Sequence, residues 1–86
     1  MNETLLGIGV EDSLTCNAEG FPQPRVTFLH LERNSTTQEV ADGDGQSIYP
    51  ITEVSKDDAG RYQCIAENLF GKVSMKTTVL VVGQSK

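Results

Sequence analysis

Positive charge is scarce in this sequence. Its 86 residues include 7 Lys and Arg against 12 Asp and Glu, which gives a net charge of −5, and the basic residues form no cluster. Nucleic acids and anionic membrane surfaces are bound through clustered Lys and Arg, so we expect neither as a partner. No apolar run approaches the roughly 20 residues of a membrane-spanning helix, and we therefore expect no direct membrane insertion.

Residues that carry chemistry are also few. The chain has one histidine, His30, two cysteines, Cys16 and Cys64, and no tryptophan. A zinc site needs three or four ligands, and these residues do not supply them at a metal-binding spacing. Nucleophilic catalysis needs an activated Ser or free Cys beside a base, and no such motif is present. The sequence predicts a protein that is not an enzyme and that uses no metal and no cofactor.

One acidic segment has the spacing of a calcium-binding loop. The first, third, fifth and twelfth places of such a loop would be Asp42, Asp44, Gln46 and Glu53. The turn glycine required at the sixth place is missing, because Ser47 stands there. We expect residues 42–45 to form a flexible acidic loop rather than a metal site.

Alternation of apolar and polar residues is the dominant pattern. It predicts β-strands over residues 11–18, 25–31, 47–54, 60–67 and 72–82, with a short edge strand over 4–10. Residues 32–47 have little apolar content, and residues 32–37 predict a turn or a short outer strand. The inward positions are Leu14, Cys16, Ala18, Val26, Phe28 and His30, then Tyr49, Ile51, Val54, Tyr62, Cys64 and Ala66, and finally Val73, Met75, Val79 and Val81.

The connections between these strands have recognisable turn chemistry. Residues 20–24 contain two prolines and predict a turn. Residues 55–58 predict one helical turn, capped by Ser55 with Asp58 three residues on. Residues 68–71 predict a hairpin turn in which Gly71 can take a positive φ. Short strands and turns at this spacing predict an all-β, two-sheet antiparallel sandwich.

Several of these residues together resemble the immunoglobulin superfamily, most closely its I-set type. The resemblance includes Leu14-Thr15-Cys16, the segment from Ala18 to Pro24, and the series Asp58, Gly60, Tyr62 and Cys64, and it covers roughly residues 5–82. It implies a Greek-key sandwich with one disulfide, Cys16–Cys64, between its sheets. It also implies a tyrosine corner formed by Asp58, Gly60 and Tyr62.

The implied disulfide has a large role in so small a domain. Closing a loop of this length contributes roughly 4 kcal/mol on the chain-entropy model. The core implied around it consists of Leu14, Val26, Phe28, Ile51, Val54, Ala66, Val79 and Val81. Phe28 stands where the family has a core Trp, so packing against the disulfide should be looser.

Two sequons, Asn2-Glu3-Thr4 and Asn34-Ser35-Thr36, make Asn2 and Asn34 candidate glycosylation sites. Candidate protein-binding residues are Phe21 and Phe70, which lie in loops, and Ile65, which should face outward from the sheet that carries residues 25–31, 60–67 and 72–82. The expected partners are other proteins, copies of the same chain, or adjacent modules of the same kind.

The resemblance implies an extracellular module of a multidomain cell-surface receptor or adhesion protein, which recognises proteins or spaces its neighbours. The alternative is a structural module of an intracellular muscle or cytoskeletal filament protein, in which both cysteines would stay reduced. We expect a single domain over residues 4–83, with residues 1–3 and 84–86 as linker and tail.

Overall fold

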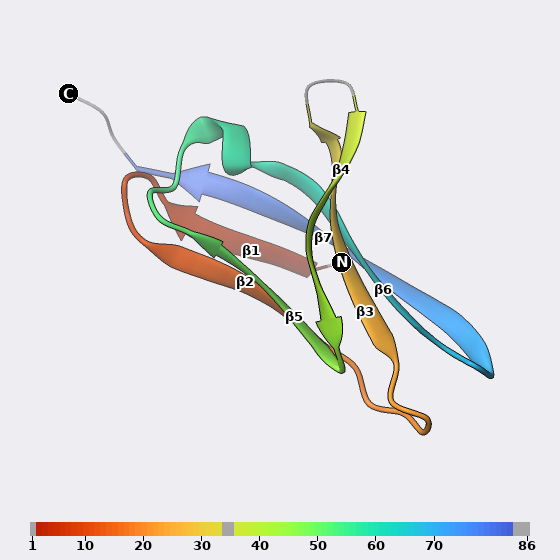
Figure 1. Ribbon diagram of the computed structural model, residues 1–86. Coiled ribbons are helices and arrows are strands. Elements are labelled where there is room, and N and C mark those ends of the chain that lie inside the picture. The colour runs from red at the N-terminus through yellow and green to blue at the C-terminus, as the bar shows by residue number, and fades with distance from the viewer. Residues whose placement is uncertain (1, 34–35, 84–86) are drawn as a thin grey trace.

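The computed structural model describes residues 2–33 and 36–83, and of Asn2, Glu32 and Arg33 it describes the backbone alone. The described chain forms two β-layers that face each other (Figure 1). Its elements are β1 (Asn2–Gly7), β2 (Asp12–Asn17), β3 (Arg25–Arg33), β4 (Thr36–Asp44), β5 (Gln46–Ile51), the 3-10 turn η1 (Lys56–Asp58), β6 (Gly60–Asn68) and β7 (Gly71–Val82). The described residues include no helix long and apolar enough to span a membrane.

The layers are unequal in size. One sheet has five strands in the order β1-β7-β6-β3-β4, and the other contains β2 and β5. All pairings are antiparallel except that of β1 with β7, which is parallel. The Cys16–Cys64 disulfide joins β2 to β6 and therefore links the sheets. The predicted all-β sandwich with an inter-sheet disulfide is confirmed, although the parallel pairing was not predicted.

The core lies between the sheets and follows the predicted alternation. Its buried apolar residues are Leu6, Leu14, Val26, Phe28, Ile51, Val54, Tyr62, Cys64, Ala66 and Val79, with Val81 partly buried at its edge. His30 is also buried, and its Nε2–H donates to the carbonyl oxygen of Ala59 at 3.1 Å. This hydrogen bond satisfies a buried polar atom, and His30 therefore has a structural role in the core.

The prediction of a flexible acidic loop at residues 42–45 is wrong. Asp42 and Asp44 belong to β4, a strand that pairs with β3 along most of its length. Apolar and polar residues do not alternate clearly in this segment. The reason is that β4 is an edge strand with one partner, and most of its side chains are exposed. Cross-strand pairing with β3 determines its conformation where its own composition gives a weak signal.

Val73 and Met75 point inward as predicted, but they do not belong to the buried core. Their strand pairs them with Ala66 and Cys64, so they are on the inner face of the sheet. They are nevertheless 70% and 56% exposed. Alternation identifies the face of a sheet toward which a side chain points, but it does not show whether another strand covers that face.

Tyr62 occupies the centre of the core and is fully buried. Its hydroxyl donates to the carbonyl oxygen of Asp58 at 2.7 Å, which fixes η1 against β6. Its ring stacks on His30 at a centroid distance of 4.1 Å and meets Phe28 edge-on at 5.8 Å. In η1, the Asp58 carboxylate accepts a hydrogen bond from the Ser55 amide at 2.8 Å, as expected for the cap.

Replacing Tyr62 by Phe should destabilise the fold by about 1–3 kcal/mol, because the Asp58 carbonyl then loses its buried donor. The measurement is the midpoint of urea unfolding, with an unchanged m-value. Tyr49→Phe is the matched control, since Tyr49 is only half-buried. Equal midpoint shifts for the two variants would contradict the role assigned to the Asp58 hydrogen bond.

Gly60 takes a positive φ, whereas Gly71, which the turn allowed to take one, does not. Gly60 has φ of +129°, and Gly71 is absent from the described glycines with positive φ. A Cβ atom added to Gly60 would lie 3.1 Å from Nε2 of His30, whereas one added to Gly71 would meet no atom within 4 Å. The glycine requirement therefore lies at the start of β6, where the chain turns out of η1.

Gly60→Ala should cost roughly 1–3 kcal/mol of stability through backbone strain and crowding of His30. Gly71→Ala provides the same chemical change at a permissive position and should be close to neutral. Thermal unfolding of both variants tests this difference. A Gly60→Ala variant as stable as Gly71→Ala would show that β6 can begin without a positive φ.

Candidate functional site

Three large apolar side chains lie exposed at one end of the sandwich. Phe21 is 92%, Leu69 84% and Phe70 80% exposed. Phe21 belongs to the loop between β2 and β3, and the other two form the β6–β7 hairpin turn. These connections lie toward the same end of the molecule, at the lower right of Figure 1. We call Phe21, Leu69 and Phe70 the loop tip.

Asn68 holds the two loops of the tip together. Its side-chain Nδ2 donates to the carbonyl oxygen of Pro22 at 2.8 Å, and its Oδ1 accepts from the Phe70 amide at 2.9 Å. One amide side chain thus positions the residue after Phe21 and the backbone of Phe70. Sequence analysis did not identify this role, although an Asn in a turn commonly bonds the backbone two residues on.

A shallow cavity adjoins the loop tip. It has a volume of about 350 Å³ and is lined by residues that include Pro24, Asn68, Phe70 and Lys72. Exposed aromatic rings beside a hollow are suited to insertion between the side chains of another protein, since aromatic residues are enriched at protein interfaces. The loop tip is thus the most exposed apolar surface among the predicted binding residues.

The sheet face around Ile65 is a weaker candidate. In register, Ile65 lies between Thr27 of β3 and Ser74 of β7. Its side chain is half-buried, so it offers less apolar surface than the loop tip. The structure brings Phe21 and Phe70 to the same end of the molecule and leaves Ile65 on a separate face.

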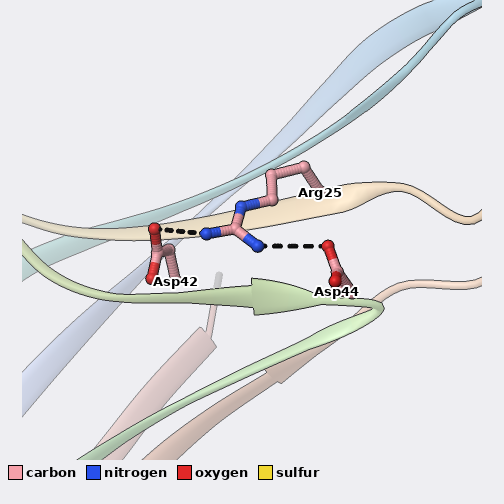
Figure 2. Close-up of polar contacts among 3 residues, drawn as sticks. All are labelled: Arg25, Asp42 and Asp44. Atoms are coloured by element: carbon pink, nitrogen blue, oxygen red, sulfur yellow. Dashed lines mark hydrogen bonds and ion pairs between the residues drawn. The ribbon is translucent and has the colours of Figure 1, made fainter.

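Charged residues alternate in sign across the neighbouring row of this face. The row runs from Asp44 through Arg25 and Glu67 to Lys72. Figure 2 shows the Arg25 guanidinium reaching Asp42 at 2.6 Å and Asp44 at 3.1 Å. These hydrogen bonds, foremost that to Asp42, raise the pKa of Arg25 above its ordinary value. Arg25 is thereby engaged in holding β4 to β3.

Of the two predicted glycosylation sites, the structure describes one in part and the other not at all. Asn34 lies outside the described residues. Asn2 begins β1, where its backbone pairs with Thr77, and its side chain lies outside the description. Among the described residues, no group of three or more His, Cys, Asp or Glu side chains is arranged to hold a metal ion.

Comparison with known proteins agrees with this architecture. A family model described as an immunoglobulin domain matches residues 2–68. That domain is a non-catalytic module, which agrees with the prediction that the chain is not an enzyme. In a crystal structure titled as a complex of titin M10 with an obscurin-like 1 Ig domain, one chain superposes with a TM-score of 0.75 at 24% identity, covering 99% of this chain and 90% of that one.

Curated relatives that are similar in sequence include the following two proteins. The human leucine-rich repeat, immunoglobulin-like domain and transmembrane domain-containing protein 3 is 35% identical over 88% of this chain and 12% of its own length. Neural cell adhesion molecule 1 of Bos taurus is 33% identical over 92% of this chain and 10% of its own length.

The chain thus spans about a tenth of the length of these relatives. Such domains occur in cell-surface adhesion and receptor proteins and also in titin-like muscle proteins. The match to the family model extends over most of the chain, and the disulfide, the tyrosine corner and the two-layer sandwich agree with it. The chain belongs to the immunoglobulin domain family, and the I-set type predicted from the sequence is consistent with its structure.

Proposed function

We propose that this chain is an extracellular module of a multidomain cell-surface receptor or adhesion protein, which recognises other proteins or spaces its neighbours. The observation that carries the proposal is the Cys16–Cys64 disulfide between β2 and β6. Disulfides persist in the oxidising environment of secreted and surface proteins and are rare in the cytosol. The relatives named for adhesion and for a transmembrane domain support the same setting.

A second candidate is a structural module of an intracellular muscle or cytoskeletal filament protein. The likeness to the titin complex favours it, because the fold superposes over almost the whole chain. In that setting Cys16 and Cys64 would be reduced and the sequons unused. The two candidates therefore differ in the chemical state of the same residues, which makes them separable by experiment.

For the extracellular candidate, we propose that Asn34 carries a glycan and that Asn2 is a second acceptor. Residues 4–83 would constitute the domain. The loop tip is the proposed contact surface for a protein partner, a second copy or an adjacent module. Its aromatic rings lie on short loops tied by Asn68, so little conformational entropy would be lost on contact.

Secretion from mammalian cells should yield a chain that is glycosylated and has no free thiols. Intact mass before and after glycosidase treatment measures the glycan, and a thiol label before and after reduction measures the disulfide. Asn34→Gln should remove the glycan mass while leaving the cysteines unlabelled. Retention in the cell, or a secreted chain that carries no glycan and has both thiols free, would instead support the intracellular filament module.

A tetrameric form of the secreted domain should stain a panel of cell lines through the loop tip. The double variant Phe21→Ser with Phe70→Ser should lose most of the staining, since large aromatic side chains dominate interface energetics. Both side chains are exposed, so the fold should be unaffected.

Leu5→Ser is the matched control, because Leu5 is also exposed but lies on β1, away from the loop tip. Staining by the control should equal that of the unaltered domain. If both variants stain equally, the loop tip is not the contact surface. If neither the unaltered domain nor the variants stain any cell, recognition by this module is not supported and the spacing role remains.

A further inference from the structure

The outer face of the larger sheet carries charges of opposite sign at its two sides. Four rows of outward side chains cross the strands β4, β3, β6 and β7, with acidic residues on β4 and basic residues on β7. In that strand order the rows are Asp44, Arg25, Glu67 and Lys72; Asp42, Thr27, Ile65 and Ser74; Glu39, Leu29, Gln63 and Lys76; and, from β3 onward, Leu31, Arg61 and Thr78. We call these four rows the charged face.

The charged face is electrically neutral, although the chain is not. Its four acidic and four basic residues are Glu39, Asp42, Asp44 and Glu67, and Arg25, Arg61, Lys72 and Lys76. The chain has 12 acidic and 7 basic residues, so the remaining 8 acidic and 3 basic residues account for its whole net charge of −5. Like net charges repel. Two copies therefore repel each other least when they meet through this face.

The order of charge in the first row is self-complementary. From β4 to β7 it is negative, positive, negative and positive, and reversing such a row places every charge opposite one of the other sign. A two-fold axis that runs along the strands, between β3 and β6, makes this reversal when two copies pack face to face. Asp44 of one copy would then meet Lys72 of the other, and Arg25 would meet Glu67.

The other charged residues of the face would meet no like charge in this arrangement. Their counterparts across the axis are Lys76 for Glu39, Ser74 for Asp42 and Leu31 for Arg61. The exposed carboxylate of Glu3 lies on β1, and β4, which would lie opposite β7, is the edge of the sheet. Glu3 therefore falls outside the contact.

Charge also selects the direction of the axis. A two-fold axis perpendicular to the strands would place β4 of one copy on β4 of the other, so that carboxylates would meet carboxylates. Like-charge contacts of this kind suppress association. The axis along the strands instead places the acidic β4 side of each copy against the basic β7 side of the other.

Arg25 is held in position for such a contact. It is exposed, and its guanidinium is bound by Asp42 at 2.6 Å and Asp44 at 3.1 Å (Figure 2). A guanidinium has five N–H donors, more than these two bonds use, so Glu67 of a second copy can join the network. Because the side chain is already fixed, little conformational entropy would be lost on contact.

We propose that two copies of this chain associate face to face through their charged faces, about a two-fold axis parallel to the strands. Each contact between β4 of one copy and β7 of the other occurs twice, as an isologous interface requires. Ile65 lies on β6 beside the axis, so its two copies are neighbours at the centre of the interface. The contact does not use the loop tip, and it stands for either setting of the module.

Sedimentation equilibrium of the 86-residue chain, up to about 1 mM, tests the proposal. We expect a monomer–dimer equilibrium that Lys76→Glu weakens about tenfold, because symmetry creates two contacts between carboxylates. Lys56→Glu makes the same change in net charge on exposed η1, outside the charged face, and should dimerise as the unaltered chain does. A chain that is monomeric at the highest concentration, or equal effects of the two variants, would overturn the proposal.

Glu39→Lys separates the proposed contact from general repulsion. It changes the net charge from −5 to −3, which by itself would strengthen association. The proposed dimer should instead weaken, because each introduced ammonium group meets Lys76 of the other copy. An equimolar mixture of Glu39→Lys and Lys76→Glu should associate as a heterodimer, since opposite charges then meet at both contacts. A stronger Glu39→Lys dimer, or a mixture that does not associate, would contradict the proposed geometry.

Self-association through the loop tip is distinguished by a further variant. Phe21→Ser with Phe70→Ser alters the loop tip and leaves the charged face intact, so this double variant should dimerise as the unaltered chain does. Loss of the dimer in the double variant would assign self-association to the loop tip and overturn the proposal.

Discussion

The inner face of β6 is the constraint on which the rest of the structure depends. Within five residues it carries Tyr62, Cys64 and Ala66, all pointing between the sheets. Cys64 is bonded to β2 in the opposite sheet, and the ring of Tyr62 lies 6.5 Å from that of Tyr49 on β5. One strand of the larger sheet therefore contacts both strands of the smaller one. A two-stranded sheet has little stability alone, so these contacts determine where it lies.

Much of this arrangement could be predicted because it is local in the sequence. Alternation assigned the inward side chains of β3, β5 and β6, and the spacing of Asp58, Gly60, Tyr62 and Cys64 identified the corner. The extent of β4 through Asp44 was not predicted, because pairing with β3 determines it and such pairing leaves little trace in the composition of an exposed edge strand. Val73 and Met75 show a related limit, because alternation identified the face toward which they point but not their exposure.

The candidate site, like the fold, could be predicted from the sequence only in part. Exposure of Phe21 and Phe70 was predictable, since both occupy short loops that contain turn residues. Their placement at one end was not, because Asn68 and Pro22 are 46 positions apart in the chain. A hydrogen bond of that sequence separation has no local pattern, and Asn68 was identified only as a turn residue. The chemistry of each loop could therefore be predicted, but the surface that they form together could not.

The parallel pairing of β1 with β7 has a mechanical consequence. Its register joins Asn2 to Thr77 at one end and Gly7 to Val82 at the other. A tension that pulls backward on the start of β1 and forward on the end of β7 would slide one strand along the other. The backbone hydrogen bonds of this pair would then bear the force together in shear, whereas a strand peeled from one end breaks its bonds one after another. A module joined to its neighbours through these two strands would resist extension by this geometry, whether at a cell surface or in a filament.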